Sequence, residues 1–412
     1  MNFKTKKILA VAVDCGFDGV KIDINKHLYS FPSYIIPMDA EKELIANGNS
    51  NSDKIIYSEL VSNQATQSYV IGSTAQTLIN DYPEDGEHRA LIDSLKDLDE
   101  FFTMKEAVYL IRSAVAYAIV KYSEDNDIGF SIEKMDSYKI YLELPLPHSI
   151  KNEAFGYLQG PLSKQTEIVM QINQNRHHIV LDIASENIYS TSQVLSVFNN
   201  YIFTEDGNII PNLENVFDIL PAIIVDGGYR TQGLASIRKD SSLLVDRVES
   251  YEDYSMIEVN KQVAKIINDK AHENELDNYN PIREYDIDEY IATKSNFVYD
   301  IKDDSAKLGK RRFCVDFKAI EQLKKDVIIE TAENYSKFLI NDYGIRNAKT
   351  IIIAGGTGAA FASTIIDYIN DYDSNIDVKL VEDNYNGRIE SPAFSIVIGA
   401  HENLLNIISA KE

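Results

Sequence analysis

The sequence predicts an α/β protein that is built from two copies of one domain. Residues 8–24 and 221–237 share one pattern: an apolar strand, an Asp, a turn that contains Gly, and a second strand. Asp14 of the first copy corresponds to Asp226 of the second, 212 positions further along a chain of 412 residues. Because this offset is about half of the chain, domain duplication explains the pattern most simply, and two unrelated β-hairpins are the alternative.

Helical and strand patterns alternate along the rest of the chain, which is typical of the α/β class. Residues 138–147 (YKIYLELPLP) read as a buried strand ended by prolines, and 350–369 read as a strand, a Gly-rich turn and a helix. Apolar residues at helical spacing predict helices over 104–122, 185–203 (with Ser185 as its N-cap), 257–270, 317–339 and 393–408.

Two polar stretches suggest insertions. Residues 39–68 and 271–310 have little periodicity, and each follows one copy of the repeated pattern. We therefore expect two inner domains that each carry an outer subdomain. The predicted boundaries are 1–220 for domain I, with an outer insertion at roughly 31–97, 221–394 for domain II, with one at roughly 271–311, and 395–412 for a C-terminal helix that returns to domain I.

The composition argues against several classes of function. The formal net charge is −24, and a surface this acidic repels phosphate backbones, so we expect no direct binding to nucleic acid. The chain has two cysteines, Cys15 and Cys314, which fits a reducing compartment. No apolar run approaches the roughly 20 residues that span a bilayer, so we expect a cytoplasmic protein without membrane contact.

The two corresponding Asp residues point to a site for phosphate and Mg²⁺. A Gly turn lets backbone N–H groups approach an anion, and a carboxylate beside a phosphate needs a cation between them. Mg²⁺ meets this need, because it keeps most of its waters and binds carboxylates together with phosphate oxygens. Asp14 and Asp226, facing each other across a cleft, would hold such an ion, and Lys21 would neutralise phosphate charge.

Five motifs, in order along the chain, resemble those of the actin, Hsp70 and sugar-kinase ATPase superfamily. VAVDCGFDGVK (11–21) is similar to its first phosphate loop, IIVDGGYRTQG (223–233) to its second, and IIIAGGTGAAF (351–361) to its adenosine motif. Residues 185–195 and 391–404 resemble its two connecting helices. Each motif alone is only moderately specific, whereas the ordered set is strong.

Within that superfamily the chain is most similar to ParM-type bacterial actins, which segregate plasmids. DGGYRT in the second loop, YVIGSTAQ (69–76) and LELPLP (142–147) carry this closer likeness. The resemblance implies the actin-like fold, in which two duplicated RNase H-like α/β domains form four subdomains around a nucleotide cleft. It also implies ATP or ADP with Mg²⁺ as cofactors, and it leaves a preference for ATP over GTP open.

The resemblance also implies roles for particular residues. Asp14 and Asp226 would lie near Mg²⁺ and contact it through water, and they would act in catalysis together with Glu186. Glu186 matches the carboxylate that positions the attacking water at the start of the first connecting helix. The alternatives are a helix-dipole role for Glu186 and a catalytic role for Glu143. The residues implied to bind nucleotide are Gly16, Phe17, Gly19, Lys21, Gly227, Gly228, Tyr229, Thr231, Gly355, Gly356 and Thr357.

Two positions depart from the pattern of the family. Asp18 stands where many relatives have Ser, Thr or Asn, and because phosphate would repel it, we expect it to turn outward or to cap the turn. Gln232 stands where many relatives carry an acid, which puts a role for this position in metal binding or hydrogen bonding in doubt.

The implied function is an ATP-dependent filament whose turnover is driven by ATP hydrolysis and which moves plasmid DNA. Its partners would be further copies of the chain and a DNA-binding adaptor of a plasmid partition system. One alternative is a small-molecule kinase of the same superfamily, although we find no compelling acceptor motif. Another is a cell-shape or division scaffold, although the chain ends carry no basic amphipathic helix.

Overall fold

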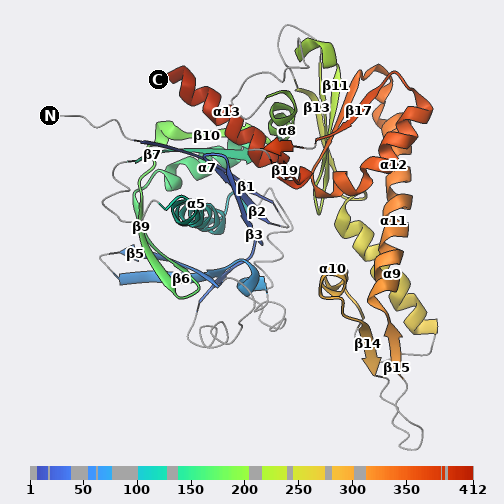
Figure 1. Ribbon diagram of the computed structural model, residues 1–412, viewed down its shortest axis with the longest axis horizontal. Coiled ribbons are helices and arrows are strands. Elements are labelled where there is room, and N and C mark those ends of the chain that lie inside the picture. The colour runs from blue at the N-terminus through green and yellow to red at the C-terminus, as the bar shows by residue number, and fades with distance from the viewer. Residues whose placement is uncertain are drawn as a thin grey trace, which may run out of the picture. The chain divides into compact units, whose positions relative to one another are not determined.

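The computed structural model describes residues 7–16, 19–38, 54–61, 64–76, 101–127, 138–203, 216–238, 245–273, 281–300, 312–381, 383–385 and 388–411. The chain divides into two compact units (Figure 1). Unit 1 comprises Met1–Glu214 together with Glu382–Glu412, and unit 2 comprises Asn215–Val381.

The central sheet of unit 1 has five strands in the order β10-β7-β1-β2-β3. Their bounds are Ile188–Ser192, Tyr138–Leu146, Lys7–Cys15, Val20–Ile24 and His27–Phe31, in that order. Strands β1, β7 and β10 run parallel, whereas β2 and β3 are joined to β1 as an antiparallel meander. The carboxyl ends of the three parallel strands therefore lie at the same edge of the sheet.

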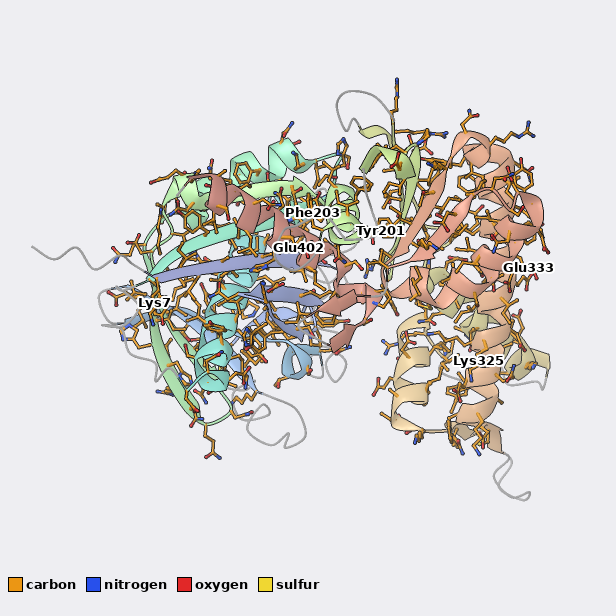
Figure 2. All side chains as sticks on the ribbon, turned by 45° about the horizontal axis from the view of Figure 1, so that its top comes forward. Lys7, Tyr201, Phe203, Lys325, Glu333 and Glu402 are labelled. Atoms are coloured by element: carbon orange, nitrogen blue, oxygen red, sulfur yellow. The ribbon has the colours of Figure 1, made fainter. Side chains whose placement is uncertain are left out.

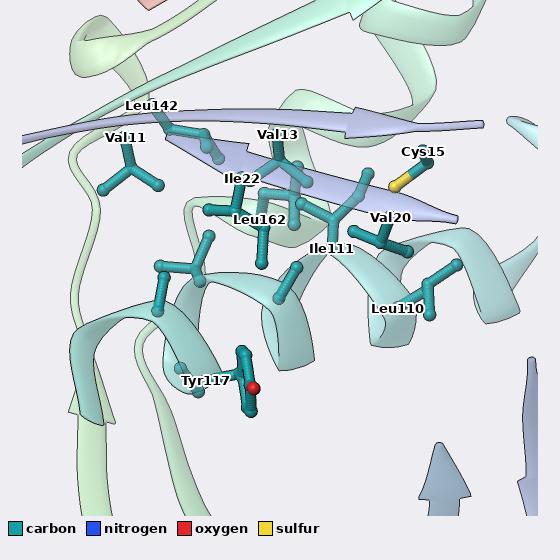
Figure 3. Packing of buried hydrophobic residues seen from close by; sticks show 14 of the residues in the cluster. Val11, Val13, Cys15, Val20, Ile22, Leu110, Ile111, Tyr117, Leu142 and Leu162 are labelled. Atoms are coloured by element: carbon teal, nitrogen blue, oxygen red, sulfur yellow. The ribbon is translucent and has the colours of Figure 1, made fainter. Parts of the chain in front are cut away.

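Helix α5 (Lys105–Asp125) forms the centre of the main core of unit 1. Alternate apolar residues of β1 and β2, such as Val11, Val13 and Ile22, pack onto it from one face of the central sheet (Figure 3). A second five-stranded sheet, in the order β4-β6-β5-β8-β9, contributes to the same core. The strands of this second sheet are β4 (Ile35–Pro37), β6 (Gln64–Ile71), β5 (Ile55–Val61), β8 (Thr166–Ile172) and β9 (Asn175–Leu181). Helix α7 (Lys151–Leu162) lies between β7 and β8 in the chain.

The opposite face of the central sheet packs against α13 (Ser395–Lys411), which itself crosses α8 (Gln193–Ile202). The two helices touch backbone to backbone, since a Cβ on Gly399 would lie 1.8 Å from the carbonyl oxygen of Ser196. The residues from Pro392 to Lys411 are apolar and long enough to cross a membrane, contrary to the expectation from sequence, but half of that window is buried. Packing inside unit 1 explains its apolar character. The hairpin β18 (Asp383–Tyr385) and β19 (Arg388–Glu390) precedes this helix.

Unit 2 repeats the topology of the central sheet of unit 1. Its strands have the order β13-β12-β11-β16-β17, with β11, β16 and β17 parallel and β12 and β13 antiparallel. Their bounds are Val245–Tyr251, Gln232–Ile237, Ala222–Gly227, Thr350–Ala354 and Asp377–Leu380. Matching order and direction in both sheets confirm the duplicated α/β fold that the sequence predicts.

Three helices pack against the core of this sheet: α9 (Met256–Glu273), α11 (Phe317–Phe338) and α12 (Gly356–Tyr372). Lys325 and Glu333 lie on the exposed side of α11 (Figure 2). Between α9 and α11 the chain forms α10 (Glu284–Thr293) and the hairpin of β14 (Phe297–Asp300) and β15 (Arg312–Val315). These elements contain much of the polar stretch 271–310.

Candidate functional site

A first candidate site lies in unit 1, at the carboxyl ends of the parallel strands of the central sheet. Asp14 is the penultimate residue of β1 and pairs with Lys21 across the β1–β2 ladder. The Lys21 ammonium lies 3.9 Å from Asp14 Oδ2. Gln193, the first residue of α8, donates from its Nε2 to Asp14 Oδ1 over 3.3 Å. The structure thus brings together two residues of one hairpin and a residue that the sequence prediction did not include.

Burial controls the charge state of Asp14, whose side chain is only 2% exposed. Loss of water around the carboxyl raises its pKa, while Lys21 and the hydrogen bond from Gln193 act in the opposite direction. A divalent cation near this carboxyl would also favour its ionised form, because it would attract the negative charge. The environment is therefore one in which a metal ion and a carboxylate stabilise each other.

The turn between β1 and β2 is held by contacts to the next part of the chain. Ser33 Oγ donates to the carbonyl oxygen of Gly16, and a Cβ on Gly19 would lie 3.3 Å from the carbonyl oxygen of Phe31. The small size of Gly19 thus permits close approach of two backbone segments. Phe17 and Asp18, which the sequence assigns to this turn, lie outside the described residues.

Glu186 lies away from this edge, and the predicted helix over 185–203 is wrong in its first half. Residues Ser185–Asn187 form a 3-10 turn, β10 follows, and the helix begins only at Gln193. Strand β10, which runs parallel to β1, has five residues and is therefore about 16 Å long. Glu186 precedes this strand and Gln193 follows it, so the two residues lie at its opposite ends. Its side chain is exposed, and its carbonyl oxygen accepts from the Lys411 ammonium. Gln193 stands where Glu186 was expected.

Glu143, the second candidate for the catalytic acid, lies in the middle of β7 and not at its end. It pairs with Ala12 of β1 and Tyr189 of β10, and it is fully buried. Asn403 of α13 donates to its Oε1 over 2.7 Å. Burial raises the pKa of Glu143 to about 8, so the group is mostly protonated at neutral pH. These contacts give Glu143 a structural place between α13 and the sheet.

A second candidate site lies at the corresponding strand ends in unit 2. Asp226 is the penultimate residue of β11 and pairs with Gly233, as Asp14 pairs with Lys21. After Asp226 the chain turns through Gly228, whose N–H donates to the carbonyl oxygen of Thr231 over 2.9 Å. The carbonyl oxygen of Tyr229 accepts from the N–H of Ile257 at the start of α9.

The Gly-rich turn between β16 and α12 packs against this loop at backbone distance. Gly355 has φ of +80°, and a Cβ there would lie 2.3 Å from the carbonyl oxygen of Gly227. A Cβ on Gly227 would in turn lie 2.0 Å from the N–H nitrogen of Gly358. Thr357 Oγ1 donates to the carbonyl oxygen of Gly228 over 2.7 Å. Residues 227–231 and 355–358 therefore pack together at the start of α12, whose helix begins at Gly356. Within this region Gly355, Thr357 and Gly358 are buried, whereas residues 228–231 are half-buried and Gly356 is exposed, so only these latter residues form its surface.

This surface fits a phosphate group by its chemistry. The first N–H groups of a helix have no partner inside the helix, and the helix dipole favours negative charge there. Gln232, one of the two departures from the family pattern, is fully buried at the start of β12 and pairs with Gly227, so its side chain faces the core.

Among the described residues, no group of three or more His, Cys, Asp or Glu side chains is arranged to hold a metal ion. Each sheet instead supplies one Asp at its edge. A single carboxylate of this kind fits Mg²⁺ that is held mainly by water and phosphate oxygens, and it does not fit an all-protein cage.

The structure resembles solved actin-like proteins over nearly its whole length. The apo ParM protein of pSK41 matches with a TM-score of 0.61 and 15% identity, covering 98% of this chain and 99% of that one. Actin-like protein Alp7A matches with a TM-score of 0.61 and 12% identity, covering 98% of each chain. A 15-stranded ParM filament from Clostridium botulinum matches with a TM-score of 0.59 and 14% identity, covering 98% of this chain and 99% of that one.

These comparisons establish the class of protein by its structure. The chain has the actin-like fold, as the motifs in its sequence indicate. The similarity to ParM-type structures is likewise confirmed at the level of the fold. No family model and no curated protein sequence matches the chain.

Proposed function

We propose that the chain is an ATP-dependent, filament-forming protein of the ParM type, and that ATP hydrolysis drives the turnover of its filaments. One observation carries the proposal. In each of two sheets of the same topology, the first strand has an Asp as its penultimate residue and is followed by a turn containing Gly, and nearly the whole chain resembles a ParM filament subunit. A protein that only shared the general α/β class would have no reason to repeat this arrangement.

We assign the binding roles as follows. Asp14 in unit 1 would help to hold Mg²⁺ through its water ligands, Asp226 in unit 2 would have the same role, and Lys21 would neutralise phosphate charge. Mg²⁺, when bound, neutralises charge that develops on the phosphate oxygens. The backbone of the first turn, the second loop and the start of α12 would bind the nucleotide; the residues are Gly16, Gly19, Gly227, Gly228, Tyr229, Thr231, Gly355, Gly356 and Thr357.

We assign the orientation of the attacking water to Gln193 in place of Glu186. The carboxamide of Gln193 already reaches the site, because it donates to Asp14. An amide is too weak a base to take a proton, but it can accept one hydrogen bond from water and donate another. Phosphoryl transfer depends mainly on positioning and charge stabilisation, so an orienting amide is sufficient for this role.

The acidic charge suits a filament that reaches DNA through an adaptor. With a net charge of −24, the protein repels DNA directly, whereas a basic DNA-bound adaptor is steered towards it. Subunits of like charge also repel one another, so assembly should strengthen as salt screens this repulsion. We therefore propose plasmid partition in the cytoplasm as the biological role.

Light scattering tests the proposal directly. The pure protein is mixed with Mg²⁺ and ATP, with Mg²⁺ and ADP, or with Mg²⁺ alone, and phosphate release is followed in the same time course. We expect scattering to rise with ATP and to decay as phosphate is released. Equal light scattering with ATP, with ADP and without nucleotide, at every salt concentration tested, would overturn the proposal. Phosphoryl transfer to a small molecule without scattering would favour a kinase instead.

A further inference from the structure

The side chain of Tyr229 points from the second phosphate loop towards the helices that follow it. Its hydroxyl donates to Asp288 Oδ2 of α10 over 3.3 Å. Asn260 of α9 donates from its Nδ2 to the same Oδ2 over 2.7 Å and to the Tyr229 hydroxyl over 3.1 Å. The loop, α9 and α10 thus meet in one closed ring of hydrogen bonds, and Asn260 is fully buried within it.

A charged partner holds this ring in place. Lys324 of α11 forms an ion pair with the other carboxylate oxygen of Asp288, Oδ1. The side chain of Lys324 is 12% exposed and that of Asp288 is 44% exposed, so water reaches the carboxylate more readily than the ammonium. Hydrogen bonds that involve a charged group are stronger than neutral ones, and this pair fixes the direction in which Asp288 accepts from Tyr229.

The second phosphate loop is therefore held from two sides. On one side, Thr357 donates to the carbonyl oxygen of Gly228, which joins the loop to the start of α12. On the other side, the Tyr229 hydroxyl joins it to α10, and the Tyr229 carbonyl accepts from Ile257 in α9. Removal of the hydroxyl would break the link to α10, while the backbone link to α9 and the link to α12 remain.

We propose that Tyr229 is a positioning residue that couples the second phosphate loop to α10. This inference rests on the proposed function, since it takes the loop to bind nucleotide phosphates. The hydroxyl holds the loop in its binding conformation from α10, and bound nucleotide in turn stabilises α10, because coupling between two sites is reciprocal. The site of nucleotide binding thereby acts on an element that contains part of the outer insertion of domain II.

The test uses the full chain with Tyr229→Phe, which removes only the hydroxyl, and Asp288→Asn, which removes the charge that Lys324 pairs with. Tyr254→Phe is the matched control, because Tyr254 lies in the same unit and stacks on Phe338 away from this ring. Calorimetry measures the affinity for Mg²⁺ with ATP. Amide hydrogen exchange over 284–293, with and without Mg²⁺ and ATP, measures the stability of α10.

We expect nucleotide to slow exchange in α10 of the wild-type protein and of the Tyr254→Phe control. In Tyr229→Phe, affinity should fall about tenfold, and nucleotide should no longer slow exchange in α10. Asp288→Asn should lose part of both effects. If Tyr229→Phe keeps wild-type affinity and the wild-type change in exchange, the coupling is refuted. If the wild-type protein itself binds no Mg²⁺ with ATP, the proposed function fails instead.

Discussion

The contact between Gly399 and Ser196 predicts opposite effects for two substitutions of the same kind. Both Gly399, in α13, and Gly156, in α7, lie inside helices of unit 1. A Cβ on Gly399 would lie 1.8 Å from the Ser196 carbonyl oxygen and 2.8 Å from the Asn200 nitrogen. A Cβ on Gly156 would meet no atom within 4 Å. Replacement by Ala is therefore blocked at one site and free at the other.

The expected change in the free energy of unfolding is the sum of two opposing effects. Ala in place of Gly inside a helix stabilises by about 0.5–1 kcal/mol. An extra methyl group in a packed contact costs about 1–3 kcal/mol, and the upper end applies at Gly399 because the opposing atoms are backbone and cannot rotate away. The net effect of Gly399→Ala is therefore a loss of about 2 kcal/mol, whereas Gly156→Ala should gain up to about 1 kcal/mol.

Differential scanning calorimetry measures both effects. For a unit of this size, 1 kcal/mol corresponds to about 2–4 °C in Tm. Gly399→Ala should thus lower the Tm of unit 1 by about 4–8 °C, and Gly156→Ala should raise it by about 1–4 °C. A Gly399→Ala protein as stable as the wild type, measured beside a stabilised Gly156→Ala protein, would refute the close helix crossing.

Three further predictions concern charge and catalysis. Asp14→Ala should weaken binding of Mg²⁺ with ATP and slow hydrolysis; unchanged values in calorimetry and phosphate release would remove Asp14 from the site. Gln193→Ala should slow phosphate release by about 10²–10⁴ with little loss of binding, while Glu186→Ala, at the opposite edge, should release phosphate at the wild-type rate. Burial raises the pKa of Glu143 from its ordinary value of 4.5 to about 8. The group therefore favours the folded state most below pH 4.5, and this contribution falls by about 1.4 kcal/mol per pH unit up to about pH 8. Glu143→Gln keeps an acceptor for Asn403 and should flatten this part of the pH profile of thermal unfolding; an unchanged profile would contradict the assignment.

The sequence predicts the inner sheets well, because their signals are local. An apolar run that ends in Asp and Gly specifies a strand and a turn without reference to the rest of the chain, and the second copy at Asp226 supports the first at Asp14. The helices over 105–125, 256–273 and 317–338 lie close to their predicted ranges for the same reason: each has apolar residues at helical spacing.

The helix predicted over 185–203, with Ser185 as its N-cap, begins only after Ser192. Ser185 and Ser192 are both suitable N-caps, and only the segment between them distinguishes the two. That segment, Ile188–Ser192, contains Ile, Tyr and Thr, which favour a strand, and it pairs with β7 along its whole length. Attention to this β propensity would have moved the helix start to Gln193.

The outer sheet of unit 1 was missed for a different reason. Its strand β5 pairs with β8, so that Ile55 lies opposite Ile172, although 116 residues separate them. The turn at Asn173 and the alternation around it predict a hairpin locally. Nothing in either segment says which distant strand it joins, because strand pairing is decided by the shared core around α5.

The common strand order of the two central sheets fits descent from one ancestral domain that was copied and fused. In a symmetric pair of separate subunits, each substitution appears in both sites at once. After fusion each copy can diverge alone, and the residues opposite the two Asp side chains have done so: Lys21 lies opposite Asp14, whereas Gly233 lies opposite Asp226. The residue opposite the Asp is thus a cation in one copy and a glycine in the other. The two copies can differ in this way only because one chain carries both of them.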